Sequence, residues 1–156
     1  MKLVLSLLLL ILYTSPVHAS SCTNKKLAKK YTVTYNEVDY GLFTFTLTII
    51  GKSNQNTYRY KLFDQKNGLF YDGELVTQCG NLYFQLPLLV GVDFYTPNAF
   101  GIDQYVGTET QRADVDCSGR LNKSGKALGN CSASLIEPNT GAPFNYSGFL
   151  ELHPSR

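Results

Sequence analysis

A two-residue alternation of apolar and polar side chains runs through most of the chain after Tyr31, and it limits the fold more than any other feature. In Leu42–Ile50, for example, apolar residues occupy every second position and Thr residues lie between them. Because successive side chains of a strand point to opposite faces, this period predicts strands with one face buried. No stretch after Tyr31 shows the 3.6-residue period of a long amphipathic helix.

The spacing of these segments defines the fold class. Strand-like runs follow one another at short intervals with turn residues between them. We predict an all-β, single-domain antiparallel meander of about eight strands. It forms a small closed or nearly closed β-barrel, with a β-sandwich as the alternative. Inward-facing glycines favour the barrel, because they permit bending or allow a large side chain to cross above them. These are Gly73, Gly119, Gly129 and Gly148.

The strand pattern is similar to that of small calycin-type barrels, which implies a similar architecture. The chain contains no Trp, however, and tryptophans mark the lipocalins and avidins of that group. Since a shared fold does not imply a shared function, the resemblance assigns no functional residue.

The alternation also specifies the register of two hairpins. A four-residue loop at Gln65–Gly68 keeps apolar residues opposite apolar ones and pairs opposite charges across the strands. The expected cross-strand pairs are Tyr35 with Phe43, Lys61 with Asp72, Arg59 with Glu74, and Tyr60 with Gly73.

The N-terminus has the features of a secretory signal peptide. Lys2 supplies the positive charge, Leu3–Leu12 the apolar stretch, and Val17–Ala19 the small-residue cleavage site. The apolar stretch is short for a membrane span. We therefore expect residues 1–19 to be removed and the protein to be secreted or periplasmic. The sequence before Cys22 loosely resembles a lipobox, but acylation there would leave an odd number of cysteines.

Four cysteines follow the signal: Cys22, Cys79, Cys117 and Cys131. An even set in an exported chain predicts disulfides. A loop at Asn122–Lys126 places Cys117 opposite Cys131 in a hairpin whose apolar residues also match. We therefore predict two disulfides, Cys117–Cys131 and Cys22–Cys79.

The mature chain has the size of one domain, since removing residues 1–19 from 156 leaves 137. It divides into an N-terminal basic arm, residues 20–30, tethered by Cys22, and an all-β domain, residues 31–156. Its 13 basic and 12 acidic residues give a net charge near +1. This balance indicates no nucleic-acid partner and no stable membrane anchor. We expect a monomer without a cofactor or metal.

Residues Pro87–Gly107 interrupt the regular pattern with an apolar, aromatic-rich connection. Long connections in compact domains are often binding loops, and aromatic rings among a few polar groups suit a sugar or an apolar molecule. The alternative is a buried strand at Leu88–Val92, with the aromatic residues plugging the barrel end. The candidate ligand-binding residues are Phe94, Tyr95, Asn98, Phe100, Asp103 and Tyr105.

Other candidate surfaces are weaker. A row of Thr residues between Thr32 and Thr48 forms an outward face that either contacts a partner or simply faces water. Asp114 and Asp116 share one face of a strand, as a carboxylate pair or part of a calcium cluster would require, but no calcium-loop motif is present. His153 has no nucleophile motif near it.

Three functions follow from these features. The leading hypothesis is an exported, non-enzymatic binding protein for a small apolar molecule or a glycan at the aromatic-rich loop. The second is a secreted protein-interaction module, an inhibitor or host-directed factor, that uses the loop or a sheet face. The third is an Asp-dependent hydrolase. A cavity beneath Phe94–Phe100 favours the first, and a filled barrel with exposed aromatic residues favours the second.

Overall fold

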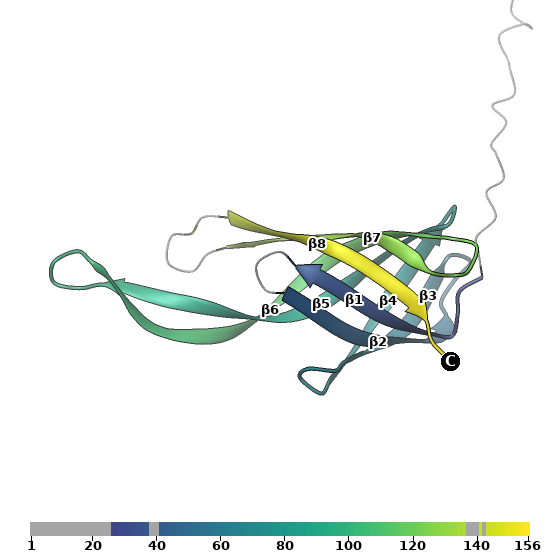
Figure 1. The fold of residues 1–156 in the computed structure, drawn as a ribbon, viewed down its shortest axis with the longest axis horizontal. Helices are drawn as coiled ribbons and strands as arrows, with labels where there is room; N and C mark the ends of the chain where they lie inside the picture. Colours follow the sequence, from purple (N-terminus) through teal and green to yellow (C-terminus); the bar gives the residue numbers. More distant parts are fainter. Residues whose placement is uncertain (1–25, 38–40, 137–140, 142) are drawn as a thin grey trace, which may run out of the picture.

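A computed structural model of the chain describes residues 26–37, 41–136, 141 and 143–156. In this part of the chain, eight strands form one antiparallel sheet (Figure 1). They are β1 (Lys30–Glu37), β2 (Gly41–Lys52), β3 (Thr57–Asp64), β4 (Leu69–Gln78), β5 (Asn81–Pro97), β6 (Asp103–Leu121), β7 (Ala127–Ile136) and β8 (Pro143–Pro154). Each strand pairs with the next, and β8 pairs with β1, so the sheet closes into a ring. The all-β prediction and the strand count are confirmed. One closed sheet replaces the two sheets of a sandwich.

The hairpin registers agree with the alternation of the sequence. Tyr35 pairs with Phe43 across β1 and β2. The turn at 65–68 places Lys61 opposite Asp72. Because a shift of one residue would turn every apolar side chain toward water, the buried face specifies these registers.

The core fills the inside of the ring with alternate residues of the strands. Most inward side chains of β1, β2 and β3 are buried, as are those of β5 from Leu82 to Val90 and those of β8 at Leu150 and Leu152. Ile49, near the end of β2, is partly buried. Burying one large apolar side chain contributes about 1.5–3 kcal/mol. Members of this core include Tyr31, Val33, Phe45, Leu47, Leu62, Leu86, Leu150 and Leu152.

Two inward glycines leave room for tyrosine rings. A Cβ at Gly73 would collide with the ring of Tyr60, and a Cβ at Gly148 would collide with the ring of Tyr35. The expected Tyr60–Gly73 pair is therefore confirmed. Each glycine permits a large side chain to cross a neighbouring strand on the inner face.

The disulfide Cys117–Cys131 joins β6 to β7 at directly opposed positions, as the sequence predicts. Its Cα atoms are 4.1 Å apart. Cys79 is also disulfide-bonded. Its expected partner Cys22 lies outside the described residues, as do the signal segment 1–19 and most of the basic arm, so the second pairing stays a prediction.

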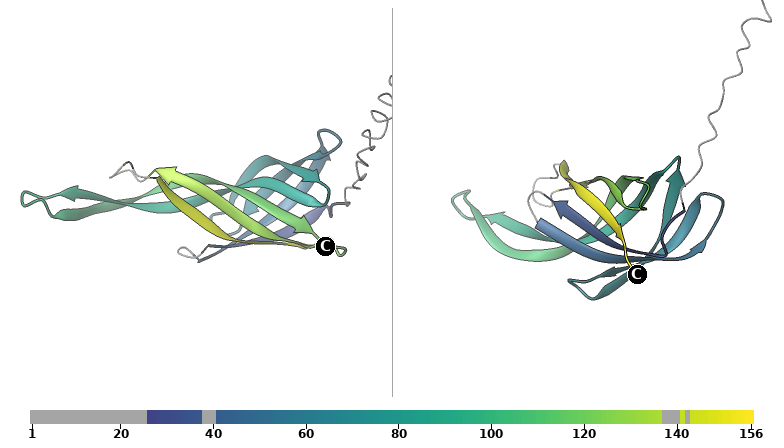
Figure 2. Two further views of the ribbon diagram at one scale, coloured as in Figure 1. Left: turned by 90° about the horizontal axis from the view of Figure 1, so that it is seen from above. Right: turned by 45° about the vertical axis from the view of Figure 1, so that its right-hand side comes forward.

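Strands β5 and β6 are the longest, with 17 and 19 residues. They pair with each other along their whole length, and their far ends extend beyond the ring as a two-stranded ribbon (Figures 1 and 2). We call residues 91–110 the arm and residues 95–106 its tip.

The arm corrects the expectation of an irregular connection at Pro87–Gly107. Most of this segment is regular hairpin, because β5 continues to Pro97 and β6 begins at Asp103. The buried strand expected at Leu88–Val92 is present as part of β5, with Leu88 and Val90 buried. The aromatic residues do not plug the ring, since the side chain of Phe100 is 88% exposed.

Candidate functional site

The tip of the arm is held together by a turn around Asn98. The side-chain Oδ1 of Asn98 accepts hydrogen bonds from the backbone N–H groups of Phe100 and Ile102, at 2.9 and 3.0 Å. Gly101 supplies the positive φ of 74° that the turn requires. Asn98, a predicted ligand-binding residue, therefore shapes the tip through its Oδ1.

Large apolar side chains crowd this tip and remain exposed. Phe100 and Ile102 are 88% and 65% exposed, at the end of the hairpin. Tyr95 and Tyr105 lie edge to face, with ring centroids 5.8 Å apart. A β-bulge between Phe94 and Tyr95 shifts the register beside these rings. The exposed set is Tyr95, Phe100, Ile102, Tyr105 and Val106.

Polar contacts tie the two strands of the arm together below the tip. The hydroxyl of Thr108 donates to the carboxylate of Asp93. The hydroxyls of Tyr105 and Thr108 are hydrogen-bonded at 2.8 Å. The structure thus brings the six predicted ligand-binding residues together on one hairpin. Phe94 and Asn98 are half-buried, the other four are exposed, and none of the six lines the cleft between β4 and β5.

A cleft that was not predicted from the sequence opens where β4 and β5 separate. Residues of β3, β6, β7 and β8 also line it. Strand β4 pairs with β5 only at Val76, Thr77 and Gln78. Where the pairing stops, an open cleft of about 710 Å³ begins, with Gly73 and Gln85 among the residues that line it. We call it the β4–β5 cleft.

Side chains bridge the β4–β5 cleft where the backbone does not. The hydroxyl of Tyr60 crosses above Gly73 and donates to the carbonyl oxygen of Gln85 at 2.7 Å. Burial raises the pKa of Tyr60 to about 12, although the bond to the Gln85 carbonyl opposes this shift. The hydroxyl therefore keeps its proton, and the bond, over the whole physiological pH range.

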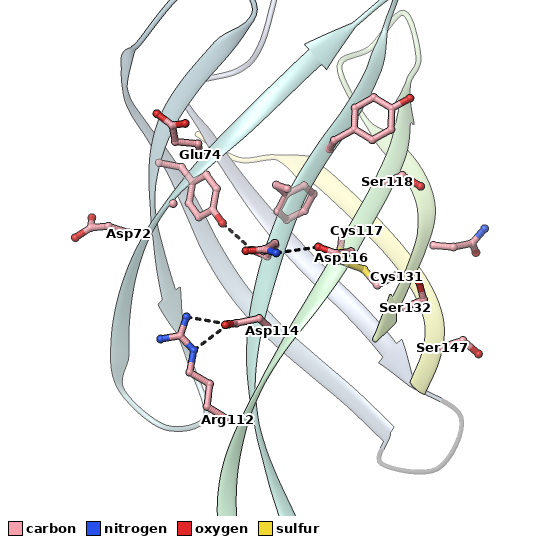
Figure 3. A pocket seen from close by; sticks show the side chains of 16 residues that line it. Asp72, Glu74, Arg112, Asp114, Asp116, Cys117, Ser118, Cys131, Ser132 and Ser147 are labelled. Atoms are coloured by element: carbon pink, nitrogen blue, oxygen red, sulfur yellow. Dashed lines mark hydrogen bonds and ion pairs between the residues drawn. A yellow bond between two sulfur atoms is a disulfide. The ribbon is translucent and has the colours of Figure 1, made fainter. Parts of the chain in front are cut away.

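A second set of contacts comes from the outer face of β6 (Figure 3). Arg112 donates to Asp114 at 2.8 Å, and its guanidinium lies 5.5 Å from the ring centroid of Tyr71 on β4. Gln85 donates to Asp116 at 2.9 Å. The two carboxylates proposed as a pair line one cleft, but each is bound by a different partner.

The remaining candidates from the sequence lie apart from both surfaces. Among the described residues, no group of three or more His, Cys, Asp or Glu side chains is placed to hold a metal ion. Thr46 accepts a hydrogen bond from the side chain of Gln65 at 3.2 Å. His153 contacts Glu151 at 2.8 Å, and this bond lowers the pKa of the Glu151 carboxyl.

Two signals in the sequence bear on the β4–β5 cleft. The pairing of Tyr60 with Gly73 indicated a ring crossing β4. Pro87, within an apolar strand, indicates a free strand edge, because proline cannot donate to a neighbouring strand. Neither signal alone gives the position at which pairing stops.

The chain has been compared with protein families, curated proteins and solved structures, and none of them matches it. The arm tip and the β4–β5 cleft are therefore judged by their own geometry and chemistry. One is a projecting apolar surface, and the other is an opening with several carboxylates among its lining side chains, beside an unpaired strand edge.

Proposed function

We propose that this chain is an exported protein-interaction module that contacts a protein partner through the tip of its arm. The observation that carries the proposal is the exposure of Phe100 and its apolar neighbours on a hairpin that extends away from the ring. A contiguous exposed apolar surface of this kind typically marks an interaction site. Exposed aromatic residues at such a position are typical binding hot spots.

The shape of the arm supports a protein partner better than a small ligand. Small-molecule sites are concave and enclose most of the ligand. The tip side chains are exposed at the end of a projecting hairpin, and none of them lines the β4–β5 cleft (Figure 1). A surface of this kind suits a protein partner that encloses the exposed side chains.

The charge of the arm argues against an anionic lipid surface as the partner. Residues 88–111 contain three acidic residues and no Lys or Arg. Anionic membranes attract basic segments and repel acidic ones. A protein surface with an apolar pocket and a basic rim matches both the aromatic residues and the acidic ones.

Export is part of the proposal. The predicted signal at 1–19 directs the chain out of the cytoplasm. The disulfide Cys117–Cys131 is compatible with an oxidising compartment. Within the described part of the chain, no helix is both long and apolar enough to cross a membrane.

A photo-crosslinker placed at position 100 tests the proposal. Benzoylphenylalanine at this position should capture a protein from the natural surroundings of the chain. The matched control carries the same group at position 123, an exposed site in the turn between β6 and β7. Capture of one partner at both positions, or flotation of the protein with anionic vesicles in place of capture, would contradict the proposal.

A further inference from the structure

Strand β4 has one edge without a strand beside it. Its residues Leu69–Leu75 pair with β3 on one side, but pairing with β5 begins only at Val76. No other described strand pairs with β4. An unpaired edge presents backbone N–H and C=O groups that can bind another extended chain. The β4–β5 cleft gives access to this edge at residues 72–74.

The facing edge of β5 is protected against strand addition. The carbonyl of Gln85 already accepts the hydroxyl of Tyr60. Residues two apart in a strand direct their backbone groups to the same edge, so Pro87 also faces the cleft. Proline has no N–H to donate. The two features together leave β4, rather than β5, as the edge that can accept a strand.

The outer face of β4 selects the charge of the incoming chain. Asp72 and Glu74 stand two residues apart on this face, opposite Lys61 and Arg59 of β3. A strand added at the open edge would place two alternate side chains beside the same carboxylates. Opposite charges at such positions stabilise a strand pair. Lys or Arg at two alternate positions would therefore repeat, on the open edge, the pattern that β3 presents on the paired edge.

The far wall of the cleft adds to this preference. Asp114 and Asp116 of β6 also line the cleft. The basic residue among the lining side chains, Arg112, is bound to Asp114. A basic side chain entering the cleft thus meets carboxylates on both walls.

We infer that the open edge of β4, residues 70–74, binds an extended segment of a partner protein that carries Lys or Arg at alternate positions. The segment adds to the sheet as a further strand. The site is separate from the arm tip and does not depend on the function proposed for it.

The Tyr60–Gln85 hydrogen bond controls access to this site. It joins β3 to β5 across β4, so a chain that enters between β4 and β5 must displace it. Replacing Tyr60 by Phe keeps the ring above Gly73 and removes the hydrogen bond. Since a typical hydrogen bond contributes about 1 kcal/mol, the variant should bind the segment roughly 5-fold more tightly.

A synthetic peptide tests the inference on the full mature protein with its disulfides intact. The probe is acetyl-Thr-Val-Lys-Thr-Lys-Val-Thr-amide, and NMR titration gives its affinity and the amides it protects from hydrogen exchange. We expect protection of the β4 amides that face the open edge, which are those of Phe70, Asp72 and Glu74, because the amide of Thr77 points to β3 and orientation alternates along the strand. Two control peptides carry Glu in place of both Lys, or N-methyl groups on alternate amides that prevent strand pairing. Neither should bind.

Substitutions of exposed residues test the contribution of charge to peptide binding without disturbing the core. Asp72→Asn together with Glu74→Gln should weaken the Lys peptide about 5-fold, because two cross-strand charge pairs are lost. Asp72→Lys with Glu74→Lys should bind the Glu peptide instead. Glu109→Gln, an exposed position on the arm outside its tip, should leave the affinity unchanged. The inference is overturned if the Lys peptide does not bind at millimolar concentration, if the N-methylated peptide binds equally, or if protection appears on the arm.

Discussion

The two halves of the β5–β6 hairpin belong to one continuous ladder but have opposite surroundings. In the near half, Leu86 and Leu88 face the core and are buried. In the far half, Tyr95 of β5 and Tyr105 of β6 are exposed on the same pair of strands. Alternation buries an apolar face only where other strands lie across from it. Beyond the ring, backbone pairing continues the hairpin without a second layer to cover it.

The far half also departs from strict alternation. Phe94 and Tyr95 are consecutive in β5, so their side chains lie on opposite faces of the ribbon, and neither is buried. Apolar residues on both faces of a two-stranded ribbon cannot be buried by one neighbouring layer. This composition suits a surface that a partner surrounds, whereas the near half suits a core wall.

Substitutions in the two halves give the largest contrast. Leu86→Ala should lower the free energy of unfolding by about 2–5 kcal/mol, because it leaves a cavity in the core. Phe100→Ser should change it by less than about 0.5 kcal/mol, because its side chain is exposed. Urea denaturation of both variants measures this difference. Equal losses would mean that the tip is packed against the body.

Removal of the Cys117–Cys131 disulfide tests how much this bond between β6 and β7 stabilises the near half of the hairpin. Replacing both residues by Ala should cost about 3 kcal/mol, as expected for a loop of this length in the chain-entropy model. Crosslinking through position 100 should persist at temperatures where this variant is still folded. Loss of crosslinking in the folded variant would show that the arm depends on the bond.

Alkaline pH should lower the stability of the ring through Tyr60 of β3, which is hydrogen-bonded to Gln85 in the near half of the hairpin. Its pKa is about 12 in the folded chain, against an ordinary value of 10, because the side chain is buried. A raised pKa means that this stability is complete below pH 10 and is lost as the pH rises from 10 toward 12. The loss should approach about 2 kcal/mol. Denaturation curves between pH 9 and 11 should show a shallower decline for Tyr60→Phe than for the parent chain.

The Tyr60–Gln85 hydrogen bond itself should contribute less to stability than the buried side chains and the disulfide of the ring. At pH 7, Tyr60→Phe should lower the free energy of unfolding by about 1 kcal/mol, the net contribution of a typical hydrogen bond. Amide exchange at Phe84–Leu86 should accelerate, since β5 loses its bond to Tyr60. Unchanged exchange there would mean that the ladder to β6 alone holds this part of β5.

The sequence predicted the ring well because each buried strand has only one acceptable register. The pairs Tyr35–Phe43 and Cys117–Cys131 follow from alternation together with loop length. Burial of one face excludes a one-residue slip, and the loop length selects among the registers that differ by two residues.

The arm and the β4–β5 cleft were harder to foresee. Pro87–Gly107 lacks the alternation that marks a half-buried strand, so the sequence predicted an irregular connection where most of the segment belongs to β5 and β6. The point at which β4 and β5 separate depends on the curvature of the whole ring, to which Gly73 and Tyr60 contribute. A local sequence pattern therefore does not predict where two neighbouring strands separate.

The most direct test of the account is partner binding by a chain with a shortened arm. Asp93 pairs with Thr108, so residues 94–107 can be replaced by Asn-Gly, which forms a two-residue hairpin turn. The ring should keep its unfolding midpoint in urea, while binding of the protein captured through position 100 should be lost. Binding at the level of the parent chain would contradict the proposal that the tip is the interaction surface.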